Sequence, residues 1–187
     1  MDLFVGIDFE TANPKRLSAC SVGLAIPRES GRLAGRYDSA RHILLSPPAG
    51  AREFNRHNVR VHGIRASDCF GAPEFPAVYK AMGHVFDDDR FVFAAHNAPF
   101  DHSVLRALCE HYGLPMPGNR WVDTVKTARR ALPDLVNHRL PTVSTALGLG
   151  EFSHHNAAED ALMTAAIATL RATDADEYRW APRTGRQ

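Results

Sequence analysis

The stretch Phe4-Val5-Gly6-Ile7-Asp8-Phe9-Glu10-Thr11 is an apolar strand that ends in two carboxylates. Because a strand turns alternate side chains to opposite faces, Asp8 and Glu10 point the same way, while Ile7 and Phe9 point into the core. The two acids lie about 6 to 7 Å apart, and their repulsion grows severalfold at the rim of a core. Alone, this pattern is also typical of the polar face of an ordinary half-buried strand. The rest of the chain decides between the two interpretations.

Composition indicates one ordinary globular domain of 187 residues, with 44% hydrophobic and 23% charged residues. The formal net charge is +1, so any affinity for nucleic acid must come from a local surface. Cys20, Cys69 and Cys109 are widely spaced and odd in number, which argues against a disulfide framework and a zinc site. The chain has no room for a signal peptide before its first strand and no apolar run of about 18 residues. We therefore expect a soluble, cytoplasmic protein.

The predicted elements are a three-stranded antiparallel meander followed by helices that alternate with strands. Strands are predicted over residues 4–10, 19–26, 36–45, 91–95 and 121–123, and helices over residues 75–85, 97–112, 124–132, 141–147 and 156–170. Residues 49–74 are predicted to be mostly irregular, as either a solvated loop or a basic loop that grips phosphates. The fold class is α/β, with one domain over 1–172 and a polar, flexible tail over 173–187.

A third acid follows the central strand. The strand leads into His96-Asn97-Ala98-Pro99-Phe100-Asp101, where Asn97 can cap a helix whose first turn accepts Pro99. Asp101 is then in the first helical turn, just beyond the end of a buried strand. Ligands bind at that edge of an open α/β sheet.

A fourth acid opens the last helix. Asn156 and Glu159 form a predicted capping box, which starts the helix at Asn156 and puts Asp160 in its first turn. His155 lies in the loop just before and is free to lean over the same end of the helix. We interpret the neighbouring His154 as incidental.

These positions bring Asp8, Glu10, Asp101 and Asp160 to one edge of the sheet, where four carboxylates cannot all stay ionised without cations. Hard oxygen ligands without cysteine specify two Mg²⁺ or Mn²⁺ ions, the arrangement used for in-line phosphoryl displacement. His155 adds a group that can accept a proton near neutral pH, and we assign it as general base. A lone histidine beside a helix start is usually structural, but here it accompanies four acids.

The sequence resembles the DEDDh family, the DnaQ-like 3′-5′ exonucleases. The resemblance consists of Asp-x-Glu-Thr at the first strand end, His-Asn-Ala-x-Phe-Asp after a central strand, and His-x-x-x-x-Asp at a late helix, and it spans residues 4–170. It implies a ribonuclease H-like fold, a mixed five-stranded sheet with antiparallel first three strands, flanked by helices. Position 156 is Asn, which excludes the tyrosine variant of the superfamily.

The resemblance also implies roles for individual residues. Asp8, Glu10 and Asp160 would hold the first metal, Asp8 and Asp101 the second, and His155 would deprotonate the attacking water. Thr11, the Val61-His62-Gly63-Ile64 segment and Asn97 would contact or support the terminal nucleotide; these substrate-binding residues are Thr11, Val61, His62 and Asn97.

The predicted function is metal-dependent hydrolysis of the terminal phosphodiester, which releases nucleoside 5′-monophosphates from the 3′ end of DNA or RNA. The predicted partner is a nucleic acid with a free, single-stranded 3′ end. Two alternatives stay open: an endonuclease of the ribonuclease H type, and a binding or scaffold module whose site has lapsed. The sequence does not decide between DNA and RNA, the oligomeric state, or whether a polymerase is a partner.

Overall fold

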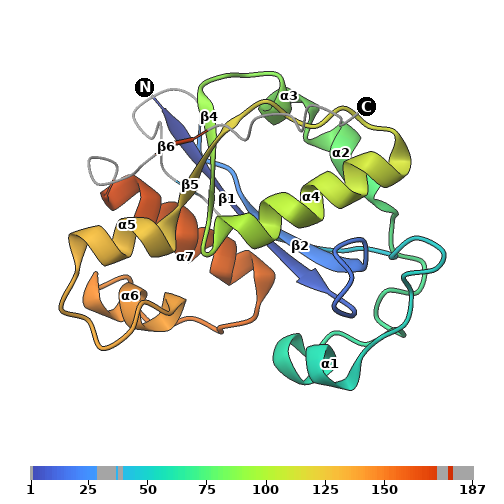
Figure 1. Cartoon of the computed structure of the whole chain (residues 1–187), viewed down its shortest axis with the longest axis horizontal. Helices are drawn as coiled ribbons and strands as arrows, with labels where there is room; N and C mark the ends of the chain where they lie inside the picture. Colours follow the sequence, from blue (N-terminus) through green and yellow to red (C-terminus); the bar gives the residue numbers. More distant parts are fainter. Residues whose placement is uncertain (1, 29–36, 38–39, 172–176, 179–187) are drawn as a thin grey trace, which may run out of the picture.

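A twisted mixed sheet runs through the computed structural model, which describes residues 2–28, 37, 40–171 and 177–178 (Figure 1). Its strands are β1 (Leu3–Thr11), β2 (Ala19–Ala25), β3 (Arg41–Leu44), β4 (Phe91–Ala95), β5 (Arg120–Asp123) and β6 (Glu177–Tyr178), in the spatial order β3-β2-β1-β4-β5-β6. The meander β1-β2-β3 is antiparallel, and β4 and β5 run parallel to β1. The predicted five-stranded mixed sheet is confirmed, and the two-residue β6 extends it antiparallel to β5.

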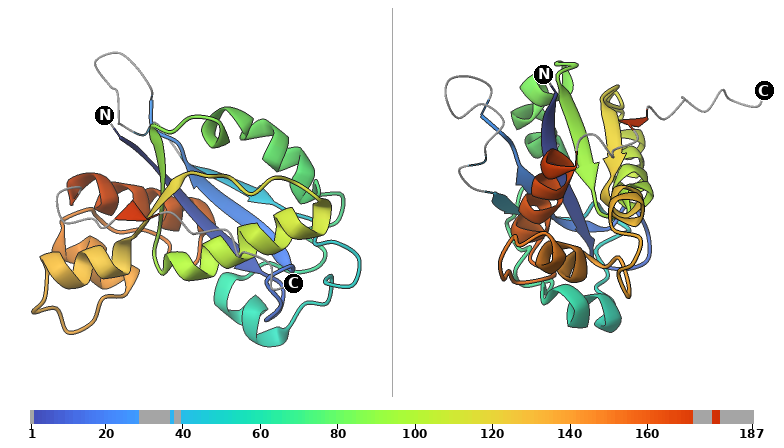
Figure 2. Two further views of the ribbon diagram at one scale, coloured as in Figure 1. Left: turned by 45° about the horizontal axis from the view of Figure 1, so that its top comes forward. Right: turned by 90° about the vertical axis from the view of Figure 1, so that its left-hand side faces the viewer.

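The helices form two layers around this sheet (Figure 2). They are α1 (Arg56–His62), α2 (Phe75–Ala81), α3 (Gly83–Phe86), α4 (Ala98–Tyr112), α5 (Thr124–Ala131), α6 (Leu140–Ala146) and α7 (Ala157–Leu170). Apolar side chains of α2, α3 and α4 pack on one face, and α7 covers the other face with α5 and α6 beside it. Among the described residues, no helix has the length and apolar content that a bilayer crossing requires.

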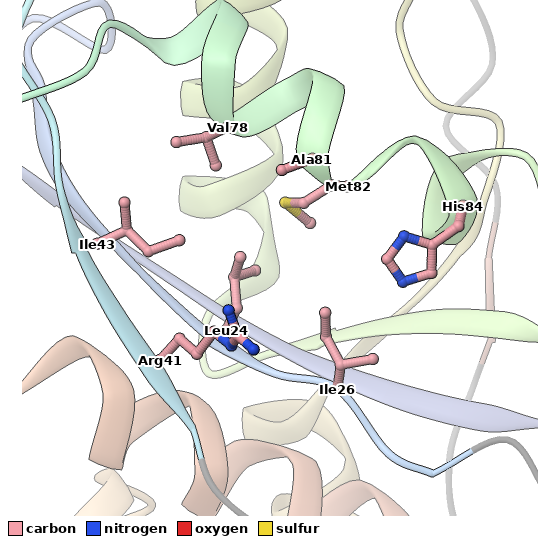
Figure 3. A pocket seen from close by; sticks show the side chains of 8 residues that line it. All are labelled: Leu24, Ile26, Arg41, Ile43, Val78, Ala81, Met82 and His84. Carbon is pink, nitrogen blue, oxygen red and sulfur yellow. The ribbon is translucent and has the colours of Figure 1, made fainter.

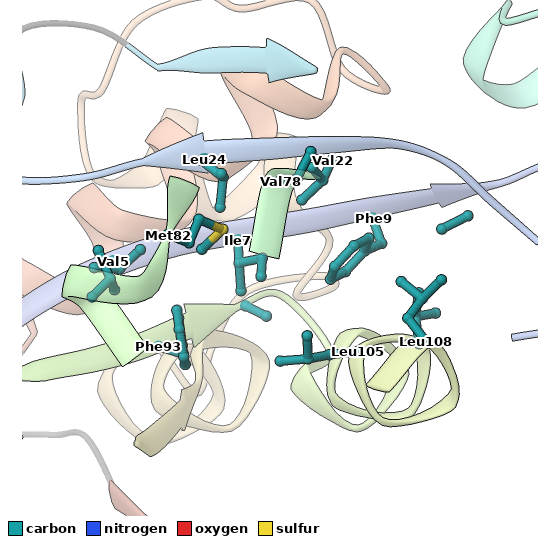
Figure 4. Close-up of a cluster of buried hydrophobic side chains, with 14 of the residues drawn as sticks. Val5, Ile7, Phe9, Val22, Leu24, Val78, Met82, Phe93, Leu105 and Leu108 are labelled. Carbon is teal, nitrogen blue, oxygen red and sulfur yellow. The ribbon is translucent and has the colours of Figure 1, made fainter. Parts of the chain in front are cut away.

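The largest described core cluster contains the apolar side chains of one face of β1 (Figure 4). Val5, Ile7 and Phe9 are buried on the face covered by α2 and α4. The alternate residues of β1 therefore face α7, as the two-residue period of a strand requires. The acids Asp8 and Glu10 belong to this second set, so burying one face of β1 presents both carboxylates on the other.

Two glycines allow α7 to lie directly on the sheet. A Cβ built on Gly6 would be 1.9 Å from the carbonyl oxygen of Ala161, and one on Gly23 would be 1.7 Å from that of Ala157. Gly23 pairs with Asp8 across the antiparallel strands β1 and β2. Because only a residue without Cβ permits this approach, the first turn of α7 is seated beside the carboxylate end of β1.

The structure corrects several predicted boundaries. Residues 49–74 contain a helix, α1, which Asn55 caps by accepting a hydrogen bond from the backbone of His57. The predicted helix over 75–85 is two helices, because Met82 leaves helical geometry before the poor helix former Gly83. The third strand is shorter than predicted, starting at residue 41; residues 36, 38 and 39 lie outside the described residues. In the predicted tail, residues 177–178 pair with β5, and residues 173–176 and 179–187 lie outside the described part.

Two predicted caps also differ. Asn97 precedes α4 as expected, but it adopts left-handed backbone geometry (φ 80°) and its side chain makes no capping bond, since such a bond needs an extended backbone. Asn156 does cap α7, by accepting from the backbone of Ala158. Glu159 reaches beyond the cap to the backbone N–H of Ser153, so the start of α7 is right but the reciprocal capping box is not formed.

A pocket of about 390 Å³ lies between the β2-β3 edge and the helices α2 and α3 (Figure 3). Its walls are mostly aliphatic, with Arg41 and His84 at the rim, and among the described residues no carboxylate lines it. The described walls of this pocket therefore contain no cluster of acids, although it is larger than the pocket of about 220 Å³ at the end of β1.

Candidate active site

Three of the four predicted acids meet at the end of β1. Carboxylate oxygens of Asp8, Glu10 and Asp160 all lie within 4.8 Å of one another. Asp8 and Glu10 come from the α7 face of β1, and Asp160 comes from the first turn of α7. The juxtaposition follows from the strand period and from the close seat of α7 on Gly23.

Asp101 lies in the wall of the same pocket, a cavity of about 220 Å³. It is buried in the first turn of α4, and its Oδ1 accepts a hydrogen bond from the backbone N–H of Phe9 (2.9 Å). This bond ties the start of α4 to the end of β1 between Asp8 and Glu10. The structure thus brings all four predicted acids to one pocket.

His155 lines this pocket with an exposed side chain, as the sequence predicted. Its backbone is left-handed (φ 68°), and its N–H donates to Oδ2 of Asp160 (3.0 Å). Among the described residues neither ring nitrogen of His155 has a hydrogen-bond partner. The ring is therefore free to receive a proton.

His154 is not incidental. Its Nδ1 lies 3.1 Å from Oδ1 of Asp160, and its ring stacks on that of His155 with centroids 3.9 Å apart. With the backbone of His155 on the other oxygen, both oxygens of Asp160 are held. The sequence pattern assigned one histidine by spacing, and it could not show that the turn before α7 also places its neighbour on the same acid.

Burial and mutual repulsion keep these carboxyl groups from ionising freely. Burial, followed by the charges of Asp101, Glu10 and Asp160, raises the pKa of Asp8 well above its ordinary value. Burial, followed by the charges of Asp160 and Asp101, raises the pKa of Glu10 to about 8. Burial raises the pKa of Asp101 to about 7 against the hydrogen bond from Phe9, and burial also raises the pKa of Asp160. The cluster needs positive charge to be ionised at neutral pH.

The donor set fits divalent cations. Oδ2 of Asp8 is shielded from solvent and has no hydrogen-bond partner in the part of the chain that the structure describes. A buried carboxylate oxygen without a donor is costly, and a cation between Asp8, Glu10 and Asp160 would satisfy it. All these ligands are oxygens. The three cysteines are free and buried, and among the described residues none of them joins the cluster, although the thiol of Cys20 donates to the backbone carbonyl oxygen of Glu10 (3.4 Å). Hard ions are the class that this set binds.

Burial favours the neutral form of two histidines in the pocket wall, His155 and His96. Burial lowers the pKa of His155, with a further lowering from His154 and an opposing effect of Asp160. Burial lowers the pKa of His96 to about 4, and both of its ring nitrogens are engaged, with the hydroxyl of Thr124 and the carbonyl of His138. The ring of His96 is therefore fixed in the pocket wall by its two hydrogen bonds, whereas the ring nitrogens of His155 can act as a base.

The predicted substrate-binding residues divide into two groups. Val61, 39% exposed, and Asn97 line the pocket. Thr11 is buried and is not one of the residues that line the pocket. Its carbonyl oxygen accepts hydrogen bonds from Asn58 (2.8 Å) and His62 (3.2 Å). His62 also accepts from the backbone of Ile64, so both of its ring nitrogens are engaged. Thr11 and His62 thus hold α1, the helix below the end of β1 in Figure 1, with Val61 at the pocket.

Sequence reasoning missed Phe100, which lines the pocket, and Arg16, which contacts the Phe100 ring. Phe100 fits the apolar stripe of α4, yet it is only half-buried and lines the pocket. The guanidinium of Arg16, in the loop after β1, lies 4.3 Å from the centre of the Phe100 ring. Its charge opposes the rise in the pKa of Asp101. A cation in a polar loop carries no periodic pattern, so the sequence offered little to find it.

Comparison with known proteins places this site in a family. The RNase T exonuclease family model matches residues 5–168. The chain belongs to this exonuclease family. The DEDDh, DnaQ-like resemblance seen in its motifs is confirmed, and the acids and the histidine of those motifs are the groups that line the pocket.

The curated relatives of this chain are much longer proteins. It is 30% identical over 167 residues to the DNA polymerase III PolC-type of Thermotoga maritima, a match covering 88% of this chain and 11% of the relative. A match of the same identity covers 87% of the chain and 11% of the PolC-type polymerase of Oceanobacillus iheyensis. The chain therefore spans about a ninth of the length of these relatives.

Solved structures confirm the fold. Exonuclease X in complex with 5′ overhanging duplex DNA is similar at a TM-score of 0.66 and 21% identity, covering 91% of this chain and 92% of that one. The nuclease domain of 3′hExo, a DEDDh family member bound to rAMP, gives a TM-score of 0.70 at 16% identity, with 92% of each chain covered. The predicted ribonuclease H-like architecture is therefore confirmed.

Proposed function

We propose that this chain is a divalent-metal-dependent 3′-5′ exonuclease that releases nucleoside 5′-monophosphates from a nucleic acid end. The observation that carries the proposal is one pocket of about 220 Å³ lined by four carboxylates and by a histidine with free ring nitrogens. Membership of the exonuclease family supports the same reaction.

The residues have distinct tasks in this proposal. Asp8, Glu10 and Asp160 would hold one Mg²⁺ or Mn²⁺ ion, and Asp8 with Asp101 would hold a second. Bound ions supply positive charge that stabilises the attacking and leaving oxygens of an in-line displacement. His155 accepts the proton of the attacking water at a ring nitrogen, because its lowered pKa keeps the imidazole neutral. The stacked His154 and the backbone bond to Asp160 orient that ring.

The substrate we propose is a single strand with a free 3′ end. Val61 and Asn97 offer an apolar and a polar contact for the terminal nucleotide at the pocket, and Thr11 and His62 act through the placement of α1. The names of the PolC-type relatives make a DNA polymerase the first protein partner to test. Three buried, free cysteines support a reducing compartment such as the cytoplasm.

The decisive experiment is product analysis. Single-stranded DNA, single-stranded RNA and a mismatched duplex, each labelled at the 5′ end, are incubated with Mg²⁺, Mn²⁺ or a chelator. A ladder that shortens one nucleotide at a time, 5′-monophosphates as products, and no reaction with chelator are expected. Asp8→Asn, which removes one charge from the cluster without changing its volume, is the matched inactive control.

The same preparation tests both alternatives. Circular single-stranded DNA stays intact with an exonuclease and is cut by an endonuclease. Calorimetric titration with Mn²⁺ shows heat of binding for a working site and none for a lapsed module. Cleavage of the circle or absence of Mn²⁺ binding would overturn the proposal.

A further inference from the structure

The loop that carries Arg16 is held in one conformation by buried polar groups. Asn13 donates from its side-chain amide to the carbonyl oxygens of Ala51 (3.1 Å) and Glu53 (2.7 Å). The hydroxyl of Ser18 donates within the loop, where it lies 2.9 Å from the carbonyl oxygen of Asn13, and it accepts from the backbone of Asn13. Asn13 and Ser18 are both buried. The loop is therefore a fixed support rather than a free connection.

A second set of bonds joins this loop to the segment that precedes α1. The backbone N–H of Asn55, the cap of α1, donates to the carbonyl oxygen of Ala12 (2.8 Å), and the ammonium of Lys15 donates to the carbonyl oxygen of Gly50 (3.2 Å). Because α1 carries Val61 to the pocket, the loop and the pocket wall share one framework.

Arg16 itself is exposed and is placed by an aromatic ring. Its guanidinium lies 4.3 Å from the centre of Phe100, a distance at which a cation is attracted to the face of a ring. Phe100 lines the pocket of the acids and stands next to Asp101 in α4. The ring therefore holds a permanent positive charge beside the pocket wall, close enough for it to act on Asp101. Among the described residues Arg16 forms no ion pair that would neutralise it.

A polyanionic strand that approaches the four acids needs a positively charged side chain beside the pocket. The pocket concentrates four acids, and the chain as a whole carries a formal charge of only +1, so no general field draws a polyanion to the site. A guanidinium is the side chain that best binds phosphate oxygens, through its fork of N–H donors. Contacts to phosphates fix the register of a nucleic acid strand without reading its bases.

We propose that Arg16 binds a backbone phosphate next to the scissile one and so sets the register of the strand in the pocket. This assignment rests on the proposed exonuclease function and names a contact of the same site that the sequence motifs do not contain. It makes the substrate a strand with at least two phosphates, and a substrate with a single phosphodiester has nothing for Arg16 to hold.

Two substrates and three variants test the proposal. The substrates are a labelled single-stranded decanucleotide and the p-nitrophenyl ester of thymidine 5′-monophosphate, which has one phosphodiester. For Arg16→Ala we expect kcat/KM on the decanucleotide to fall by about 10- to 100-fold, mainly through KM, and the ester rate to stay within about twofold. Arg16→Lys keeps the charge without the fork and should lie between. Lys80→Ala removes an exposed cation from α2, outside the pocket of the acids, and should stay within about twofold on both substrates.

The salt dependence of decanucleotide binding is an independent test of the Arg16 contact. Removing one phosphate contact should reduce the slope of log affinity against log salt by about 0.7 for a single strand. Fluorescence anisotropy of the labelled decanucleotide in Ca²⁺ measures this slope without turnover, so the Arg16 contact is tested even if the wild-type chain hydrolyses neither substrate.

Three results would overturn the assignment. Unchanged decanucleotide binding and turnover in Arg16→Ala would show that Arg16 touches no substrate. An equal loss on both substrates would show that it only supports Phe100 and Asp101. An equal loss in Lys80→Ala would show that the effect comes from general charge. Loss of wild-type hydrolysis with intact Arg16-dependent binding would instead contradict the proposed function alone.

Discussion

Replacing Gly23 with alanine should disable the site from the neighbouring strand β2, because it pushes α7 away from the sheet. A Cβ at Gly23 would lie 1.7 Å from the carbonyl oxygen of Ala157, and contacts below 3.0 Å are essentially never found. Strand β2 and helix α7 must therefore separate by at least about 1.3 Å. The obstacle is backbone, which cannot rotate away as a flexible side chain would.

The displacement acts on the acids because α7 carries Asp160. Three carboxylates now lie within 4.8 Å of one another, and Mg²⁺ demands near-ideal geometry at about 2.0 to 2.1 Å from each oxygen. A misplacement of about 1 Å can lower turnover by about 100-fold, and overpacking of this kind costs about 1 to 3 kcal/mol of stability. Gly23→Ala should thus lose about 100-fold in activity and bind Mn²⁺ more weakly.

Gly83→Ala is the matched control, because Gly83 lies in the short helix α3 with nothing within 4 Å of the new methyl group. It should keep its activity and gain up to about 1 kcal/mol of stability. Gel assays of strand shortening, calorimetry with Mn²⁺ and thermal unfolding by circular dichroism measure the three quantities. A folded Gly23→Ala variant with activity and Mn²⁺ affinity within about twofold of wild type would refute the close seating of α7.

The remaining predictions concern charge at the site. His155→Ala should lower turnover by about 100-fold or more and leave Mn²⁺ binding unchanged in calorimetry; near-normal turnover would disprove its role as base. Glu10 has a folded pKa of about 8 and an ordinary value of 4.5, so the metal-free protein should lose stability as pH rises from about 5 to 8, as thermal melts in chelator would show. Added Mn²⁺ should reduce this loss, and a flat profile in chelator would contradict the buried, repelling cluster. Asp8→Asn should abolish the Mn²⁺ response and raise metal-free stability at pH 8, because it removes a buried charge; a lower melting temperature would argue against that charge being unpaired.

The sequence predicted the parts of the site that depend on periodicity and capping. The alternation in β1 put Asp8 and Glu10 on one face, and the cap at Asn156 put Asp160 in the first turn of α7. These local rules were sufficient because each acid lies within a few residues of an element boundary. The general-base role of His155 was predicted from its place in the loop beside the four acids, and the family resemblance implied the same role.

What the sequence could not predict depends on contacts between distant segments. His154 reaches Asp160 only because the turn before α7 has left-handed geometry at position 155. Phe100 satisfies the apolar pattern of α4 equally well as a core residue or as a pocket wall, and Arg16 meets it across 84 positions of chain. Helix α1 was hidden because none of its residues is buried, so it has no apolar stripe.

The short strand β6 has a practical consequence for shortened versions of the protein. The sequence suggested a domain boundary at residue 172, yet residues 177–178 pair with β5 beside Trp121 and Val122. Cutting at 172 would uncover the backbone donors and acceptors along that edge, and bare edges recruit other strands. Such truncations are expected to self-associate at high concentration, whereas chains that retain residue 178 keep this edge covered.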